Sequence, residues 1–143
     1  MITRLVKGLA AGVAGVAVAV ALGAAPASAA YSYEWDEGPL SEGPTGTFYC
    51  VQTDYSGVCF EPYGDKIFVL DLSSADHASA VARWVTDYGR WGTCRNAHGA
   101  GTWAVCDKDF KEGATLKFRA AQYDGDTGTW WGEESLARSV STG

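Results

Sequence analysis

Tryptophan is the residue type in this sequence that most strongly suggests ligand binding. Four of the six tryptophans lie beside glycines or polar residues rather than inside aliphatic runs: Trp91, Trp103, Trp130 and Trp131. An aromatic ring exposed on a β-domain stacks on sugar rings or anchors a protein partner. Because Trp130 and Trp131 are adjacent, a strand would direct them to opposite faces. The alternative is that tryptophan fills a small core, which we favour for Trp84 and for one of the adjacent pair.

A second hypothesis assigns binding to a loop. An inhibitor of an extracellular enzyme presents a rigid exposed loop beside a disulfide. Two segments have that setting: Tyr55, between Cys50 and Cys59, and the tip at Asn96–Gly101. A sugar-binding protein would instead present coplanar exposed rings on one face. We expect a non-enzymatic binding domain, with carbohydrate or cell envelope as the first ligand hypothesis and enzyme inhibition as the alternative.

Catalytic constellations are weak in this chain. His77 and His98 are the only histidines, which limits acid–base catalysis near neutral pH. A catalytic triad of Ser79, His77 and Asp76 would consist of sequence neighbours, whereas triads are assembled from separated segments. Pairs of acidic residues could supply the two carboxylates of a glycoside hydrolase, but in turns such pairs are more often solvated surface charges. These pairs are Glu133 with Glu134, Asp107 with Asp109 and Asp124 with Asp126. We expect no catalytic residues and no cofactor.

Metal binding is also not expected. The cysteine gaps are long for a zinc site, although His98 lies near Cys94 and Cys106. Asp124-x-Asp126 resembles the start of a calcium loop but lacks the third acid and the distal glutamate. The segment is better interpreted as a hairpin turn.

Residues 1–30 have the pattern of a cleavable export signal. Arg4 and Lys7 precede the uncharged run Leu9–Ala25, and Pro26 is followed by small residues that suit signal peptidase. Cleavage is expected before Ala30 or, preferably, before Tyr31. An uncleaved anchor is the alternative, which the Ala- and Gly-rich composition disfavours. The pattern predicts a secreted protein without membrane attachment after cleavage.

Export implies an oxidising compartment, in which four cysteines are expected to form disulfides. Geometry favours the two local pairings. Folding the chain at Ala100 places Cys94 opposite Cys106 in an antiparallel pair, and a turn at residues 54–55 places Cys50 opposite Cys59. Each closed loop is expected to contribute about 2–3 kcal/mol.

Short apolar runs separated by turn residues predict an all-β fold. From Phe48 onward the runs are Phe48–Gln52, Gly57–Phe60, Lys66–Leu72, Ser79–Tyr88, Arg90–Asn96, Thr102–Asp107, Thr115–Tyr123 and Thr129–Trp131. Many short strands of even spacing are typical of a sandwich or barrel. We expect a small disulfide-stapled antiparallel β-sandwich as a single domain over residues 48–143. Residues 31–47 are rich in loop-forming residues and are expected to form an arm or leader.

One segment, residues 75–88, is ambiguous. Ala78, Val81, Ala82 and Val85 share one face of a helix that Gly89 could end, which would make the fold α+β. Intrinsic propensity alone favours that helix.

A resemblance bears on this ambiguity. The spacings are Asp71-x4-Asp76-x2-Ser79-Ala80-Val81, Gly92-x-Cys94-x-Asn96-x2-Gly99-x-Gly101-Thr102-x3-Cys106 and Glu112-Gly113-x3-Lys117-Phe118-Arg119. This pattern, from about Cys59 to Arg119, resembles a group of small exported actinobacterial proteins without assigned activity. In that group Asp-Gly usually stands where this chain has Asp76-His77, which implies a turn followed by a strand. Relatives also carry a further cysteine pair near the C-terminus, where this chain has Ala121 and Trp131.

The charge balance limits the partners. Seventeen acidic residues against eleven basic ones give a net charge of −6, and loss of Arg4 and Lys7 with the leader makes the remainder more acidic. Such a chain is a poor match for nucleic acid, phosphate-rich walls or anionic membranes. We expect an extracellular glycan or protein as the partner.

Overall fold

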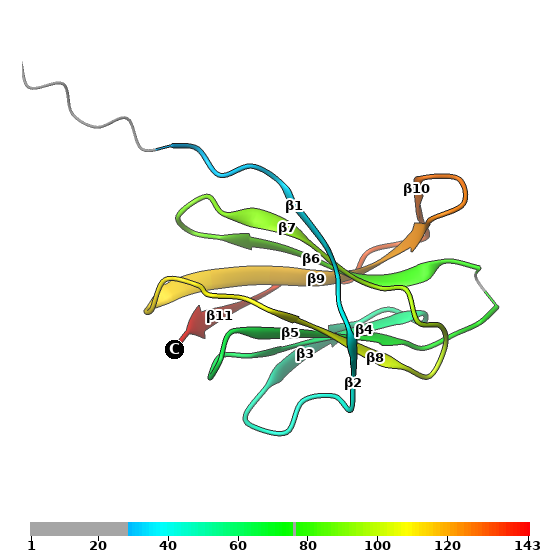
Figure 1. The fold of residues 1–143 in the computed structure, drawn as a ribbon, viewed down its shortest axis with the longest axis horizontal. Helices are drawn as coiled ribbons and strands as arrows, with labels where there is room; N and C mark the ends of the chain where they lie inside the picture. The colour runs from blue at the N-terminus through cyan, green and yellow to red at the C-terminus, as the bar shows by residue number, and fades with distance from the viewer. Residues whose placement is uncertain (1–28, 76) are drawn as a thin grey trace, which may run out of the picture.

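The computed structural model describes residues 29–75 and 77–143, so the predicted export signal lies almost wholly outside the described residues. The described chain contains eleven strands in two packed sheets, with no helix (Figure 1). This confirms the predicted all-β, disulfide-stapled sandwich. The strands are β1 (Glu34–Glu37), β2 (Leu40–Ser41), β3 (Tyr49–Gln52), β4 (Ser56–Glu61), β5 (Lys66–Asp71), β6 (Ser79–Thr86), β7 (Trp91–Asn96), β8 (Trp103–Asp107), β9 (Ala114–Asp124), β10 (Thr129–Trp131) and β11 (Arg138–Thr142).

The strands divide into two layers. Sheet A has the order β1-β7-β6-β9-β10, and β11 also pairs with β9. Sheet B has the order β2-β8-β5-β4-β3. Every pairing is antiparallel except that of β1 with β7, which is parallel. Figure 1 shows sheet A above sheet B, with the C-terminal strand β11 beside β9.

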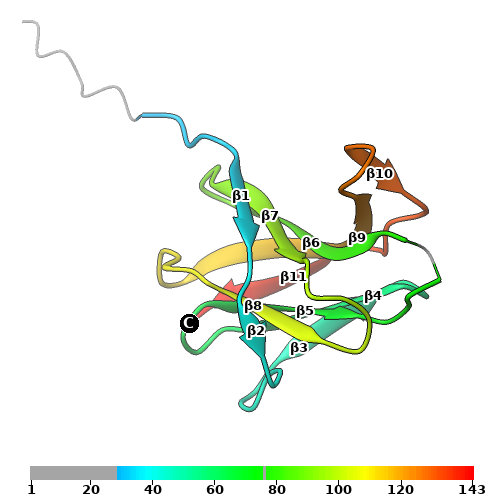
Figure 2. The same cartoon turned by 45° about the vertical axis from the view of Figure 1, so that its right-hand side comes forward.

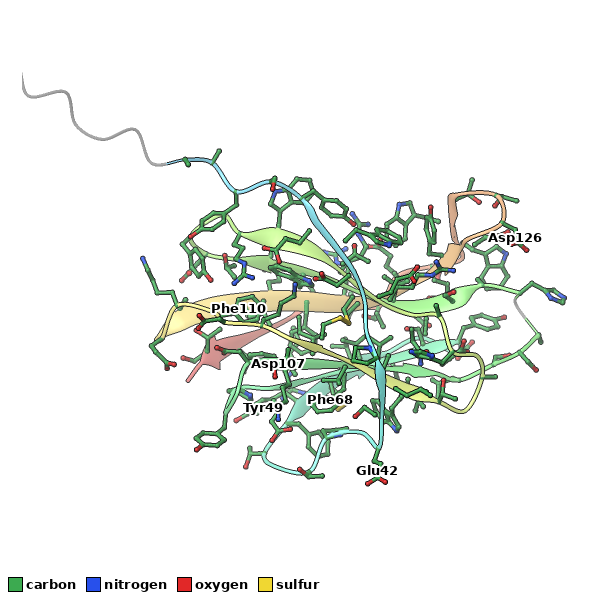
Figure 3. The ribbon with its side chains drawn as sticks, viewed as in Figure 1. Glu42, Tyr49, Phe68, Asp107, Phe110 and Asp126 are labelled. Carbon is green, nitrogen blue, oxygen red and sulfur yellow. A yellow bond between two sulfur atoms is a disulfide. The ribbon has the colours of Figure 1, made fainter. Side chains whose placement is uncertain are left out.

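Apolar side chains from both sheets fill the space between the layers. Phe60, Ile67, Leu116 and Phe118 are among the largest fully buried side chains. Phe110, from the β8–β9 connection, inserts its ring between the sheets at 6.1 Å from Phe60 (Figure 3). Burial of such aromatic and aliphatic surface is the main stabilising term of the domain.

The ambiguous segment 75–88 contains strand β6, so the helix alternative is wrong. β6 pairs along its length with β7 on one side and β9 on the other. Backbone hydrogen bonds to two neighbours and burial of Trp84 outweigh the local helix propensity of an alanine-rich segment. His77, just before the strand, has the left-handed backbone conformation of a turn, with φ of 52°.

The segment 31–47 differs from its predicted loop character, because it contributes the edge strands β1 and β2. β1 pairs with β7 in sheet A and β2 with β8 in sheet B, so the segment crosses from one layer to the other (Figure 2). Polar edge strands lack the apolar runs by which buried strands are recognised. Gly92 of β7 lets β1 approach, because a Cβ there would collide with the Glu34 backbone.

Ion pairs fasten β1 to its surroundings. Arg90 Nε lies 2.6 Å from Glu34 Oε1, and Lys108 Nζ lies 2.8 Å from Glu34 Oε2. Lys108 also pairs with Asp36, and Arg95 Nη1 lies 2.8 Å from Glu37 Oε1. The hydrogen bond from Arg90 is the largest influence on Glu34 and lowers the pKa of its carboxyl group, with Lys108 adding to the effect and burial opposing it.

The two predicted disulfides are present, but one has an unexpected position. Cys50 and Cys59 face each other across the β3–β4 hairpin, as predicted. Cys94 and Cys106 are also bonded, yet β7 and β8 belong to different sheets, so the predicted hairpin pairing is wrong and this disulfide joins the layers. Two disulfides indicate an oxidising compartment. No helix long and apolar enough to span a membrane occurs in residues 29–75 and 77–143.

Candidate binding site: the aromatic face of sheet A

The outward surface of sheet A carries a continuous group of aromatic side chains. In a strand, alternate side chains point to the same face, so the cross-strand register identifies this set. Trp35 pairs with Thr93, and Trp130 pairs with Tyr123, while Tyr33 and Trp91 lie side by side at the edge formed by β1 and β7. We call this group the aromatic face: Tyr33, Trp35, Trp91, Tyr123 and Trp130.

The rings of the aromatic face form a chain of contacts. Ring centroids lie 4.6 Å apart for Tyr33 and Trp91, 6.5 Å for Tyr33 and Trp35, and 4.8 Å for Trp35 and Tyr123. Trp130 lies 6.3 Å from Trp35 and 5.3 Å from Tyr123. Neighbouring rings are inclined by 52° to 66°, so they are tilted against one another and not coplanar.

These rings have a structural role and also retain free surface. Beneath them, Val81, Thr93 and Ala121 lie on the outward side of sheet A by register and are almost fully buried, at 0% to 1% exposure. Trp35, Trp91 and Trp130 nevertheless keep 38%, 45% and 44% of their surface exposed. The aromatic face therefore covers a small secondary core and still presents ring surface to solvent.

Arginines are interleaved with the rings. The guanidinium carbon of Arg83 lies 4.7 Å from the centroid of Trp130, and that of Arg95 lies 5.6 Å from Tyr123. Such cation–π contacts orient the arginine side chains along the ring surfaces. Arg83 and Arg119 both donate hydrogen bonds to Glu134. Burial raises the pKa of the Glu134 carboxyl group, but the hydrogen bonds from these two arginines outweigh it and lower the pKa overall.

A hollow of about 320 Å³ adjoins one end of the aromatic face. Its lining includes the rings of Tyr33 and Trp91, the side chain of Val85 and three cationic residues, and no acidic residue. The cationic residues are Arg83, Lys117 and Arg119. We call this feature the cationic hollow. It combines flat apolar surface with hydrogen-bond donors, the combination by which proteins bind small polar ligands.

Two of the five aromatic residues predicted from the sequence belong to the aromatic face. Trp91 and Trp130 lie on it, whereas Trp131 points to the other side of β10, as expected for adjacent strand residues. Trp131 contacts Tyr55 at 4.9 Å, so these two predicted residues form a separate pair at the β3–β4 turn. Trp103 lies on sheet B, half-buried against Phe68 at 6.4 Å.

Three members of the aromatic face were missed from the sequence. Tyr33 and Trp35 fall in the segment predicted to be loop, although the alternation of Tyr31, Tyr33 and Trp35 has the two-residue period of a strand. Tyr123 lies within a predicted strand, but its neighbours on the face come from other strands. That alternation was the one local signal available.

A second hollow, of about 370 Å³, lies on the outward side of sheet B. Its lining is mainly apolar and includes Phe48, Leu70, Trp103 and the Cys50–Cys59 disulfide, with Glu42 as its one charged residue. Figure 3 shows Glu42 at the outer end of this layer, remote from Asp126 on the β9–β10 turn of sheet A. The cationic hollow is lined mainly by residues of sheet A and this second hollow mainly by residues of sheet B, so the two lie on different layers and Trp103 does not contribute to the aromatic face.

The residues considered for catalysis have other contacts. Ser79 Oγ accepts a hydrogen bond from Arg95 Nε at 3.0 Å, and His77 is exposed on its turn, while Asp76 lies outside the described residues. His98 Nε2 lies 2.8 Å from the Gly38 carbonyl oxygen. The Asp124 carboxylate accepts hydrogen bonds from the backbone N–H groups of Asp126 and Thr127, as in a hairpin turn. Across residues 29–75 and 77–143, no group of three or more potential metal ligands occurs.

The two loops considered for inhibition differ in exposure. Tyr55 is half-buried against Trp131, so it does not project as an inhibitory side chain would. The tip after Asn96 is exposed, and Asn96 Nδ2 holds its base by donating to the Thr102 and Val69 carbonyl oxygens at 2.7 and 3.1 Å. Apart from His98, the residues of that tip have small side chains or none, and the His98 ring already forms a hydrogen bond with the Gly38 carbonyl oxygen.

Comparison with known proteins adds no identification. No family model, no curated protein and no solved structure matches this chain.

Proposed function

We propose that this protein is a secreted, non-enzymatic binding domain that holds a glycan chain along the aromatic face. The exposed rings of Trp35, Trp91 and Trp130 carry the proposal, because they form one contiguous surface built from three separate strands. Sugar rings present C–H groups that pack on aromatic rings, and hydroxyl groups that bond to donors such as arginine. The export pattern of residues 1–30 and the two disulfides support a site of action outside the cytoplasm.

The tilt of the rings favours a single glycan chain over a crystalline polysaccharide surface. A flat crystalline polysaccharide would require coplanar rings, whereas contacting rings on the aromatic face are inclined by 52° to 66°. A single flexible chain can follow such a surface, because each sugar unit takes its own orientation. We therefore assign binding to soluble or solvated glycan chains rather than to crystalline fibres.

The test is binding of the purified protein to a panel of soluble neutral and acidic polysaccharides, by affinity electrophoresis with tryptophan fluorescence. Trp130→Ala and Trp131→Ala form a matched pair, because the two residues are adjacent and similarly exposed but only Trp130 lies on the aromatic face. Trp91→Ala and Trp130→Ala are each expected to weaken binding at least tenfold, corresponding to about 1.4 kcal/mol. Trp131→Ala is expected to bind within twofold of the wild type.

Two results would reject the proposal. Absence of binding to every polysaccharide would shift the assignment to a protein partner, of which an extracellular enzyme is the first candidate. Equal losses in Trp130→Ala and Trp131→Ala would show that the aromatic face is not the binding surface.

A further inference from the structure

The cationic hollow has a charge composition opposite to that of the whole chain. Acidic residues outnumber basic ones by seventeen to eleven in the sequence, yet the hollow is lined by Arg83, Lys117 and Arg119 and by no acid. A local concentration of cations in an acidic protein indicates complementarity to a specific anionic group.

The register of sheet A makes this concentration costly unless an anion is present. Arg83 of β6 is directly opposite Arg119 of β9. Lys117, two residues before Arg119 on β9, pairs with Val85 of β6. Like charges in facing positions destabilise an antiparallel pair. Glu134, from the segment between β10 and β11, offsets this repulsion by accepting a hydrogen bond from Nη1 of each arginine. The arginine pair is thus already arranged around a carboxylate.

Donors remain free after this contact. Each guanidinium has five N–H groups, and within the described residues Arg83 and Arg119 direct side-chain hydrogen bonds to Glu134 alone. Lys117 is exposed and forms no ion pair in the described part of the chain. The planar fork of arginine suits a carboxylate especially well, because two parallel hydrogen bonds can form.

We propose that the cationic hollow is a subsite for a carboxylate-bearing sugar, so that the glycan held on the aromatic face is a polyuronate; this inference rests on the proposed function. The sugar ring packs on Trp91 and Tyr33, and its carboxylate bonds to Lys117 and the free donors of the arginine pair. A volume of about 320 Å³ lies within the usual range of small-molecule sites, about 300–1,000 Å³. The net negative charge of the chain does not prevent this, because charges more than about 8–10 Å away are screened at physiological ionic strength.

The experiment compares trigalacturonic acid with its methyl ester, which keeps the sugar rings and removes the charge. Calorimetric titration of the purified protein is expected to give at least tenfold tighter binding of the acid. Lys117→Gln should weaken binding of the acid at least fivefold and leave the ester unchanged. Lys111→Gln is the matched control, since Lys111 is exposed but lies over Tyr88 outside the hollow, and it should bind both ligands like the wild type.

A second variant gives a result that loss of folding cannot imitate. Glu134→Gln removes the internal carboxylate that shares the arginine pair, so it is expected to tighten binding of the acid severalfold. Weaker binding by Glu134→Gln would overturn the assignment of the arginine pair as the carboxylate site.

The remaining outcomes separate this inference from the proposed function. Equal binding of acid and ester overturns the carboxylate subsite but leaves glycan binding intact, whereas binding of neither ligand, nor of any other polysaccharide, rejects both. If a sulfated trisaccharide binds more tightly than the acid, the anionic group recognised by the hollow is a sulfate and the carboxylate assignment is overturned. Pentaglutamate that binds more tightly would assign the hollow to an acidic protein partner.

Discussion

At the scale of single residues, two non-glycine residues in the described part of the chain have backbone conformations that favour glycine. His77 and Asp65 both have φ of 52°, in the left-handed region where a Cβ is unfavourable. Their side chains differ in what they contribute. The buried Asp65 carboxylate accepts a hydrogen bond from the Phe110 backbone N–H at 3.0 Å, whereas His77 is exposed. Burial is the main reason that the pKa of Asp65 is raised.

This difference predicts opposite effects of the same substitution. His77→Gly is expected to raise the free energy of unfolding by about 0.5–1 kcal/mol, because relief of backbone strain exceeds the added entropy of the unfolded chain. Asp65→Gly is expected to lower it by about 1–2 kcal/mol, because the Phe110 N–H loses its buried acceptor. Urea unfolding of both variants measures the effect. A destabilised His77→Gly variant would contradict the strain argument.

Local pattern predicted some residue-scale features well. The opposite orientation of Trp130 and Trp131 follows from the two-residue period of a strand and is confirmed. The burial of Trp84 is likewise confirmed, at 3% exposure. Trp103 could not be assigned in this way, because its environment comes from Phe68 of β5 and from the segment around Gly43.

At the scale of elements, the strands with apolar runs were predictable and the polar edge strands were not. Each of the eight predicted runs overlaps one strand of the structure, in order from β3 to β10. β1, β2 and β11 were missed because an edge strand on the surface pairs through its backbone and needs no apolar face. β1 shows the consequence most clearly, since ion pairs attach it to Arg90, just before β7, and to Lys108, just after β8.

The attachment of β1 is expected to depend on pH. The folded-state pKa of Glu34 is lowered below its ordinary value of 4.5, so the stabilisation is present above that pH and is lost as the pH falls through the lowered value. Glu34→Gln should lower the free energy of unfolding by about 1–2 kcal/mol at pH 7, because Arg90 and Lys108 lose a charged acceptor.

Urea unfolding of Glu34→Gln and the wild type at pH 7 and pH 3 tests this dependence, and the difference between them should shrink at pH 3. Glu42→Gln serves as the control, because Glu42 is exposed and forms no ion pair in the described part of the chain. A difference of the same size at both pH values would contradict the ionic attachment of β1.

At the scale of the whole molecule, the two disulfides have different roles despite similar loop lengths. Cys50 and Cys59 reinforce one hairpin and are separated by 9 residues, whereas Cys94 and Cys106 are separated by 12 and connect the two sheets. The second disulfide is also the more deeply buried, since Cys94 is fully buried and Cys50 is exposed.

Removal of the two disulfides is therefore expected to have unequal effects. The chain-entropy contribution is about 3 kcal/mol for either loop. The double variant Cys94→Ala with Cys106→Ala should lose at least about 1 kcal/mol more than Cys50→Ala with Cys59→Ala, because it also leaves a cavity between the sheets. Denaturant unfolding of the two double variants under identical conditions gives the comparison. Equal losses would mean that the inter-sheet position adds nothing to loop closure.

Local spacing in the sequence was sufficient for most strand positions and for the choice of cysteine partners, because turns, alternation and short loops act over a few residues. For residues 75–88 local propensity alone favoured a helix, so the all-β class did not follow from local spacing throughout. The arrangement of the layers was not accessible in this way. Cys94 and Cys106 belong to different sheets, although their spacing is that of a hairpin.

The aromatic face depends on the same kind of long-range pairing. Trp35, Trp91 and Trp130 are far apart in the chain and meet because β1, β7, β6, β9 and β10 assemble in that order. Which side chains share a face is set by sheet order and register, and these arise from backbone pairing and burial across the whole domain. Only the folded molecule brings these rings and the three cations of the hollow together.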